Sequence, residues 1–394
     1  MTKIYDTKPL TPEQVKVIKD SVPILEHMQV KLAEKFYKRL FKGHSEFREF
    51  FNTTNQKLLR QPRILIFTLI KFAKSIDNLD ALQKDFDRIA SKHVGLQVSP
   101  EQYPIFGKYL VHTIADLFPN DMVDEEFVEA WQSAYDILSG ILIGLEAQQY
   151  KNKAWFGFKE FKVTKINREC VESKSFYIAP VDGAPIPKPK RGQYLCMRWQ
   201  LPGEPYEISR VYSISEYPKG NEYRFTVRYI PGGKISTHIH SNLQVGDSVY
   251  VAPPCGDCFY ESSSRDLVML AGGNGITALI SMIEAGLEEG RNVKLLFSNR
   301  STDSRSFGSV LRDFKIKYGD KFQVTEFLSR GRAIEPIDQY YRRSLTIEDL
   351  DFITPKHDVY LIGPRAYMKM VDDYLHERNI KVKLDYFGPQ EINI

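Results

Sequence analysis

Apolar positions divide the chain into three stretches with different periodicity. From about residue 11 to residue 150 they recur every three to four residues, which predicts long amphipathic helices. One such series spans five turns: Phe127, Trp131, Ala134, Leu138, Ile141 and Leu145. Thr11 and Pro12 suit the N-cap and the first turn of the first helix. We therefore predict an all-α domain over 1–150.

The other two stretches have strand character. After Trp155, short alternating runs are separated by turn residues, which predicts an antiparallel β-barrel or sandwich over 151–264. From Asp266, apolar strands alternate with helical segments, as in an α/β doubly wound parallel sheet over 265–394. The turn-rich stretches 181–192 and 330–343 are predicted to be loops inside these domains.

Composition narrows the class of protein. With 54 basic and 50 acidic residues the net charge is +4, and no basic stripe indicates nucleic-acid binding. No apolar run reaches the roughly 18 residues of a membrane span, and the N-terminus lacks the apolar core of a secretory signal. We expect a cytoplasmic monomer without membrane insertion.

Several short motifs in the second and third domains suit the binding of phosphate groups. Gly232 and Gly233 precede a short helical pattern, where backbone N–H groups and a helix N-terminus favour an anion. The segment 270–277, LAGGNGIT, follows an apolar strand and opens a helix, the usual setting of a phosphate-binding turn. Each motif alone is weak evidence, because an arginine in a strand or a glycine pair in a hairpin is commonly structural.

The order and spacing of RVYS, GGKIS, GGNGIT, IGP and FGP resemble the ferredoxin-NADP reductase superfamily over 155–394. The resemblance implies an FAD-binding barrel followed by an NAD(P)-binding domain. It implies that Arg210 holds the FAD pyrophosphate, Tyr212 stacks on the isoalloxazine and Ser213 hydrogen-bonds near the flavin N5. The other flavin and nucleotide contacts that we assign on this resemblance are Tyr194, Gly233, Lys234, Ile235, Ser236, Gly272, Gly273, Asn274, Gly275, Ile276, Thr277, Gly363, Pro364 and Phe387, the last as a cover for the flavin ring.

Details of the nucleotide domain bear on the electron donor. Ser298, Arg300 and Arg305 follow its second strand, where a 2′-phosphate would lie, and arginine suits phosphate recognition, so NADPH is favoured over NADH. Ala278 and Ile362 depart from the superfamily, which often has proline and cysteine there. These departures predict altered access of the nicotinamide to the flavin.

The four cysteines do not form a disulfide scaffold. Cys255 and Cys258 form a solitary C-x-x-C without two further ligands at the spacing of a zinc site. The pair is therefore either a reversible disulfide or two ordinary thiols.

A histidine ends an apolar stripe in the first domain. Phe86, Ile89, Ala90 and His93 share one helix face, and Gly95 follows where a helix C-terminus favours glycine. A histidine that is merely stabilised by the negative helix end is the alternative to a functional ligand.

Three polar residues share stripes that are otherwise apolar. Gln61 heads a stripe with Leu65 and Leu69, although leucine would gain about 1.5–3 kcal/mol by burial there, whereas an unsatisfied buried amide costs about 1–3 kcal/mol. Tyr37 continues the apolar face formed by Val30, Ala33 and Phe36, and a core tyrosine remains an alternative. Glu146 lies on the face of Tyr135, Leu138 and Leu142, where a carboxylate needs a partner.

An all-α domain fused to a flavin reductase needs an electron acceptor. The order of helices resembles the globin domain of flavohaemoglobins, with Phe51 at the end of FREFFN, Gln61 opening the next helix, and Lys92-His93 followed by Gln102-Tyr103-Pro104. The resemblance implies haem b with His93 as the proximal iron ligand, Tyr37 and Gln61 as the distal pair facing O₂, and Leu65 and Phe51 as the apolar wall. It implies that Tyr103 and Glu146 hydrogen-bond around His93 and favour O–O chemistry over oxygen storage. Lys92 either assists electron entry or is an ordinary helix-terminal lysine.

The resemblance implies a nitric oxide dioxygenase, in which NAD(P)H reduces FAD, the flavin reduces haem, and NO and O₂ give nitrate. Two alternatives stay open. The same electron chain could serve a peroxide, a quinone or a ferric chelate, or the protein could be a haem gas sensor.

Overall fold

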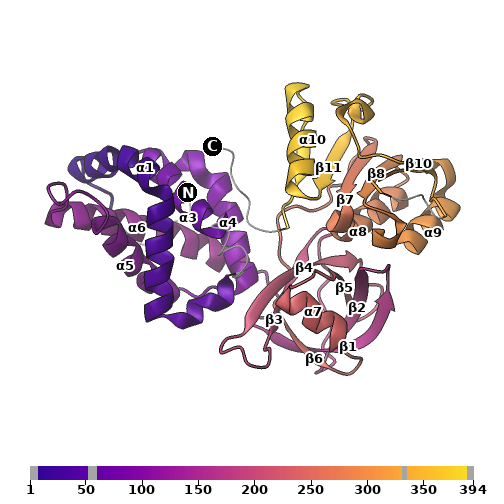
Figure 1. Cartoon of the computed structure of the whole chain (residues 1–394), viewed down its shortest axis with the longest axis horizontal. Helices are drawn as coiled ribbons and strands as arrows, with labels where there is room; N and C mark the ends of the chain where they lie inside the picture. Colours follow the sequence, from indigo (N-terminus) through magenta and orange to yellow (C-terminus); the bar gives the residue numbers. More distant parts are fainter. Residues whose placement is uncertain (1–7, 52–59, 331–334, 388–394) are drawn as a thin grey trace. The chain divides into compact units, whose positions relative to one another are not determined.

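The computed structural model describes residues 8–51, 60–330 and 335–387, and the side chains of residues 60–62 are outside this description. The chain divides into two compact units. Among the described residues, one unit contains 8–51, 60–157 and 200–209, and the other contains most of 158–387. Figure 1 shows a helical unit and a unit that contains two β-sheets.

The N-terminal part of the first unit, up to residue 157, is all-α, as predicted. Its helices are α1 (Pro12–Gly43), η1 (Ser45–Phe50), α3 (Arg60–Lys74), η2 (Leu79–Leu82), α4 (Gln83–Leu96), α5 (Gln102–Ala115) and α6 (Glu125–Tyr150). The predicted start of α1 is confirmed, because the Thr11 hydroxyl accepts a hydrogen bond from the Gln14 N–H and Pro12 lies in the first turn. Pro62 lies in the first turn of α3, so this helix begins beside the proline.

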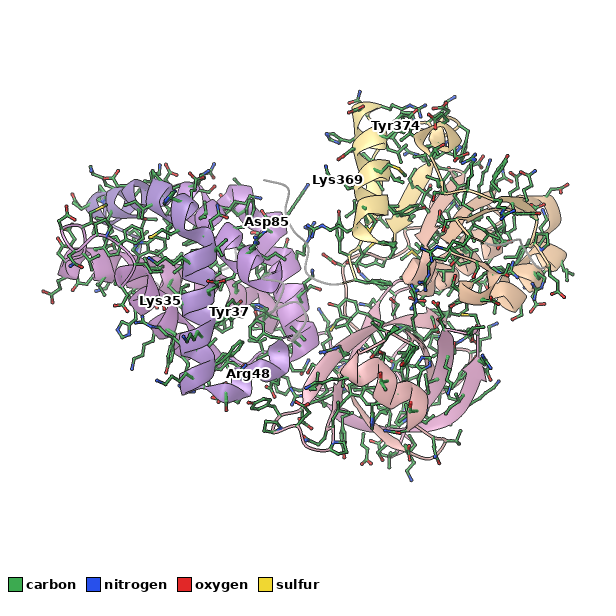
Figure 2. All side chains as sticks on the ribbon, viewed as in Figure 1. Lys35, Tyr37, Arg48, Asp85, Lys369 and Tyr374 are labelled. Atoms are coloured by element: carbon green, nitrogen blue, oxygen red, sulfur yellow. The ribbon has the colours of Figure 1, made fainter. Side chains whose placement is uncertain are left out.

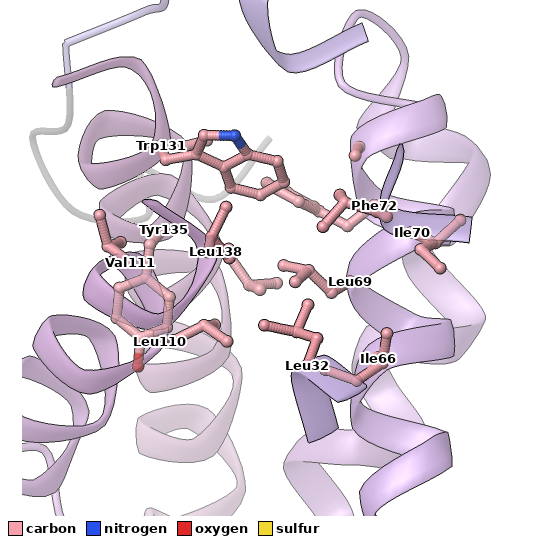
Figure 3. Packing of buried hydrophobic residues seen from close by; sticks show 14 of the residues in the cluster. Leu32, Ile66, Leu69, Ile70, Phe72, Leu110, Val111, Trp131, Tyr135 and Leu138 are labelled. Carbon is pink, nitrogen blue, oxygen red and sulfur yellow. The ribbon is translucent and has the colours of Figure 1, made fainter. Parts of the chain in front are cut away.

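One hydrophobic core joins these helices. Figure 3 shows Leu32 of α1, Leu69 and Phe72 of α3, and Trp131 and Leu138 of α6 in the packed interior, all of them buried. Val30 was predicted on the stripe that leads to Tyr37, but it is 40% exposed, so that stripe is buried only from Ala33 onward.

The second unit begins with a closed antiparallel barrel in the order β1-β2-β5-β4-β3-β6. Its elements are β1 (Lys159–Arg168), β2 (Ser173–Pro180), β3 (Tyr194–Trp199), β4 (Ile208–Glu216), β5 (Tyr223–Arg228), α7 (Lys234–Ser241) and β6 (Ser248–Val251). The sequence prediction missed β2, which pairs with both β1 and β5. The predicted loop over 181–192 is confirmed.

A parallel sheet follows in the order β10-β9-β8-β7-β11-β12. Its elements are β7 (Leu267–Gly272), η3 (Gly273–Gly275), α8 (Ile276–Glu288), β8 (Val293–Asn299), η4 (Thr302–Ser304), α9 (Gly308–Tyr318), η5 (Gly319–Lys321), β9 (Phe322–Leu328), β10 (Gln339–Tyr341), η6 (Ile347–Leu350), β11 (Asp358–Ile362), α10 (Arg365–Glu377) and β12 (Val382–Leu384). The short strands β10 and β12 at the two edges were not predicted, and β10 lies within the stretch 330–343 that was predicted to be a loop.

Both faces of this sheet are covered, which explains the continuous apolar runs of its strands. In β7, Met269 and Ala271 pack on the side of α8 and α9, whereas Val268 and Leu270 pack on the side of α10. Figure 1 shows these helices around the strands. The predicted order of folds along the chain is confirmed: an all-α domain, then an antiparallel barrel, then a doubly wound α/β domain.

Candidate functional site

Three side chains from three helices meet at His93. The Nδ1 atom of His93 on α4 lies 2.8 Å from the hydroxyl of Tyr103 on α5 and 2.9 Å from Oε1 of Glu146 on α6. The Tyr103 hydroxyl also donates a hydrogen bond to Glu146 Oε1. An ionised carboxylate only accepts hydrogen bonds, so this arrangement places the imidazole proton on Nδ1 and leaves the lone pair on Nε2.

Burial determines the protonation state of Tyr103 in this cluster of side chains. Glu146 is 2% exposed, and the partners that a carboxylate on this apolar helix face was expected to need are His93 and Tyr103. Burial, together with the nearby Glu146 carboxylate, raises the pKa of Tyr103 far above its ordinary value. Tyr103 is therefore a neutral hydrogen-bond donor at every physiological pH.

Packing behind Tyr103 fixes its position. The hydroxyl of Tyr135 on α6 donates a 2.8 Å hydrogen bond to the backbone oxygen of Tyr103. The Tyr135 ring lies directly against Gly107 of α5, where any Cβ would overlap it. Tyr135 thus couples α5 to α6, and Figure 3 shows it beside Leu110 and Val111.

The helix that carries His93 ends later than predicted. Gly95 is a buried residue inside α4, and the left-handed residue is Gln97, with a φ of 60°. The Gln97 side chain donates a 2.6 Å hydrogen bond to the Val94 oxygen and accepts a 2.7 Å hydrogen bond from the Gly157 N–H. These two hydrogen bonds stabilise the left-handed backbone conformation of Gln97, a conformation that usually favours glycine.

Aromatic rings surround the second candidate residue of the helical unit, Tyr37. Its ring centroid lies 4.9 Å from that of Phe36 and 5.2 Å from that of Phe51. Burial raises the pKa of the Tyr37 phenol, so its hydroxyl stays protonated. Figure 2 marks Tyr37 on α1. Leu65 of α3 is partly buried against the same core, whereas the Gln61 side chain lies outside the described residues.

The donor set at His93 fits a haem iron. Nδ1 is occupied by the carboxylate, and within the described chain no hydrogen bond engages Nε2. The His93 side chain is 30% exposed, so a ligand can reach it. A metal-bound histidine characteristically donates its other N–H to a carboxylate or a carbonyl. Lys92, next along α4, is half-buried, and its predicted role in electron entry is not tested by this geometry.

The predicted flavin residues lie on β4 and around α7. Ser213 is buried, and the Tyr212 ring lies 5.4 Å from that of Phe225. Desolvation lowers the pKa of Arg210, as it does for a guanidinium that lies away from water. Gly233 caps α7, and a Cβ there would lie 2.7 Å from the Ser236 Oγ and 3.0 Å from the Ile230 oxygen. Lys234 and Ile235 form the first turn of this helix.

The predicted glycine turn lies where the strand order of the parallel sheet reverses. Strand β7 lies between β8 and β11, and β7 ends at Gly272. A Cβ at Gly272 would lie 2.5 Å from Pro364 Cδ, and one at Gly275 would overlap the Ile362 backbone oxygen. Thr277 donates a 2.8 Å hydrogen bond to the Asn274 oxygen. Dinucleotides bind outside the carboxyl ends of strands at such a reversal.

Comparisons with known proteins agree with this geometry. The globin family model matches residues 34–142, the oxidoreductase FAD-binding domain model matches 186–260, and the oxidoreductase NAD-binding domain model matches 269–373. A flavohemoprotein of Candida albicans is 52% identical over 99% of this chain and 100% of its own length. A flavohemoprotein of Schizosaccharomyces pombe is 39% identical over 98% and 93% of the two chains.

The chain belongs to the flavohemoprotein family. It is therefore a flavin- and NAD-binding oxidoreductase fused to a globin. A flavohemoglobin of Malassezia yamatoensis, solved with bound FAD and heme, has the same fold at a TM-score of 0.85, covering 97% of this chain and 100% of its own at 22% identity. The FAD/NAD-binding domain of nitric oxide dioxygenase from Vibrio cholerae matches 59% of this chain and all of its own at a TM-score of 0.53 and 25% identity.

Two arginines of this flavohemoprotein were predicted to bind a 2′-phosphate, and the structure separates them. Arg305 is buried, pairs with Glu326 at 2.9 Å and donates a hydrogen bond to the Glu335 oxygen, so it serves the interior of the domain. Arg300, directly after β8, is half exposed. Ser298 is the penultimate residue of β8, two residues before Arg300. The sequence did not show that Arg305 pairs with a buried carboxylate, that of Glu326 on β9.

The remaining positions singled out in the sequence differ in burial and in hydrogen bonding. Tyr194 is held by a pair of backbone hydrogen bonds with Cys255, of 2.8 and 2.9 Å. Phe387 is 52% exposed, and its predicted role as a cover for the flavin stays a prediction. The unusual residues Ala278 and Ile362 are both buried in the core between the sheet and α8.

The cysteine pair has the properties of two thiols. Cys255 and Cys258 are both unbonded to other cysteines. Burial raises the pKa of the Cys258 thiol to about 12, which disfavours the reactive thiolate. Across residues 8–51, 60–330 and 335–387, no cluster of metal-ligating side chains supports a zinc site. In the same ranges, no helix is long and apolar enough to cross a membrane.

Proposed function

We propose that this flavohemoprotein is an NAD(P)H-dependent nitric oxide dioxygenase. In the overall reaction, one NAD(P)H supplies two electrons, and two NO and two O₂ become two nitrate ions with release of one proton. NO and O₂ are the small-molecule substrates. Haem b and FAD, when bound, supply the oxygen activation and the single-electron steps.

The observation that carries the proposal is the hydrogen bond between the His93 Nδ1 and a buried carboxylate. Glu146 draws the imidazole proton toward itself, so the ring becomes a stronger electron donor through Nε2. Strong proximal donation favours O–O chemistry over reversible oxygen storage. A simple oxygen carrier would need neither this carboxylate nor a fused reductase.

The remaining residues orient the reactants. Tyr37, kept protonated by burial, would offer a hydrogen bond to O₂. Arg210 and the backbone of residues 233–236 would hold FAD by its phosphates, and the turn over 272–277 would receive NAD(P)H. The association of a Vibrio cholerae nitric oxide dioxygenase with the same reductase fold supports this assignment.

The test is NO consumption by purified holoprotein under air, with NADPH and NADH supplied separately and nitrate measured as product. We expect many turnovers that require both O₂ and nucleotide, with one nitrate formed for each NO consumed. A single turnover would favour the haem gas sensor. Faster nucleotide oxidation by a peroxide, a quinone or a ferric chelate than by NO would instead favour another acceptor and contradict the proposal.

A further inference from the structure

A single carboxylate in the reductase unit binds two arginines from different elements. Glu172, in the turn between β1 and β2, accepts hydrogen bonds of 2.6 and 2.7 Å from Arg300 Nη2 on its two oxygens. The same carboxylate accepts a 3.0 Å hydrogen bond from Arg228 Nε and lies 2.8 Å from Arg228 Nη2. None of the sequence motifs pointed to Glu172 or to Arg228.

Both guanidinium groups lie at the carboxyl end of the parallel sheet. Arg228 is the last residue of β5, and its Nη1 lies 3.8 Å from the position that a Cβ on Gly273 would occupy, in the glycine turn after β7. Arg300 follows the last residue of β8, which is the parallel neighbour of β7. The three charged side chains therefore lie along the edge where an NAD(P)H molecule would lie.

A further residue at this edge has unused hydrogen-bonding capacity. Asn299, the last residue of β8, is 8% exposed, and both polar atoms of its amide lack a hydrogen-bond partner among the described residues. Buried amide groups are normally satisfied, so the end of β8 is suited to a polar ligand.

We propose that Glu172 sets the choice between NADPH and NADH, because its carboxylate occupies on Arg300 the place that the 2′-phosphate of NADPH would take. NADPH must displace Glu172 from Arg300, whereas NADH leaves the ion pair intact. This proposal rests on the use of a nicotinamide nucleotide in the proposed function, and it is independent of the identity of the final electron acceptor.

The exposure of the pair makes such an exchange feasible. The side chains of Glu172, Arg228 and Arg300 are 31%, 34% and 50% exposed, so their attraction is weakened by water and salt. A phosphate carries more charge than a carboxylate and presents oxygens that match the guanidinium fork. The nearby pair Arg305–Glu326 is 7% and 0% exposed, so breaking it would strand a buried charge. Of these two ion pairs, the Glu172 pair is therefore the one that can yield to a ligand.

The experiment measures the binding of two nucleotide fragments to the full-length holoprotein by isothermal titration calorimetry. The probes are 2′,5′-ADP, which carries the 2′-phosphate, and 5′-AMP, which lacks it. In Glu172→Gln we expect affinity for 2′,5′-ADP to rise about tenfold, the effect of one charge-assisted contact, and affinity for 5′-AMP to change less than about threefold. The double variant Glu172→Gln, Arg300→Ala should lose the gain.

The matched control is Glu222→Gln, which removes the same charge from an exposed residue just before the opposite end of β5. It should leave both affinities unchanged. Equal gains for the two probes, or a gain that survives the loss of Arg300, would overturn the role of Glu172 and leave the proposed function standing. If neither probe bound the wild-type protein, the proposed electron donor and this inference would both be wrong.

Discussion

Two carboxylates in this flavohemoprotein each bind two partners, but they differ in exposure. Glu146 in the globin unit is 2% exposed and accepts hydrogen bonds from His93 and Tyr103. Glu172 in the reductase unit is 31% exposed and pairs with two arginines. The first group is enclosed by the fold, whereas the second faces solvent.

This difference separates a fixed arrangement from an exchangeable one. A buried network is strong only while every member is satisfied, so it holds the imidazole in one tautomer and one orientation. A half-exposed ion pair contributes little to stability and can be replaced by a ligand of the same charge. In the proposed function, the enclosed group suits a cofactor that stays bound, and the exposed pair suits a nucleotide that leaves after each turnover.

The largest effect should follow the loss of His93. In His93→Ala the proposed haem iron would lose its proximal ligand, so haem retention and NO turnover should fall by more than about 100-fold, beyond the loss typical of outer partners of a ligand. Haem content is measured from the Soret absorbance and turnover from NO consumption.

The matched control for this change is His27→Ala, because His27 is an exposed histidine on α1. It should keep both haem and activity. Full NO turnover by His93→Ala would show that the buried network does not hold the reactive centre.

A smaller effect should follow a change in the packing behind Tyr103. In Gly107→Ala the new methyl group would overlap the Tyr135 ring, which must move and release the Tyr103 backbone oxygen. We expect a loss of about 1–3 kcal/mol in the free energy of unfolding of the globin unit, measured by denaturant titration monitored at the Soret band.

Gly220→Ala is the control for this substitution, because nothing lies within 4 Å of a Cβ at that position. Unchanged stability of Gly107→Ala would mean that the Tyr135 ring shifts freely and does not position Tyr103.

The smallest expected effect is a change in how the stability of the reductase unit depends on pH. Desolvation lowers the pKa of His240 on α7, and its neutral ring donates a 2.8 Å hydrogen bond to the Val227 oxygen. The contribution of this group to stability is present above its ordinary pKa of about 6.5 and is lost as the pH falls below that value. The melting temperature followed by flavin fluorescence should therefore fall less on acidification in His240→Gln than in the wild type. An equal fall in both proteins would contradict this role.

Much of the fold could be predicted from the sequence, because periodicity records which faces are buried. The stripe through Phe86 and Ala90 and the runs of β7 and β8 specify their elements directly. Strand β2 was missed, because two of its buried positions, Ser173 and Ser175, are polar and interrupt the apolar alternation. The edge strands β10 and β12 are only three residues long each, too short for a periodic signal.

The candidate site could be predicted only in part. His93 and Tyr103 are 10 residues apart, but Glu146 lies 53 residues after His93. Only the family resemblance joined the three before the structure did. The sequence favoured Gly95 over Gln97 as the end of the helix. The two hydrogen bonds of the Gln97 side chain form only in the folded chain and leave no pattern in the sequence. Sequence reasoning also missed Glu172, because an ion pair with residues 56 and 128 positions away leaves no local pattern.

The proposed reaction depends most on stronger electron donation by the His93 ring, caused by its hydrogen bond to Glu146. The most direct test is the iron–histidine stretching frequency of the reduced, ligand-free holoprotein, measured by resonance Raman spectroscopy in the wild type and in Glu146→Gln. Glutamine keeps the size of the side chain but offers a neutral acceptor, so we expect a lower frequency in the variant. The same frequency in both proteins would contradict this role of Glu146.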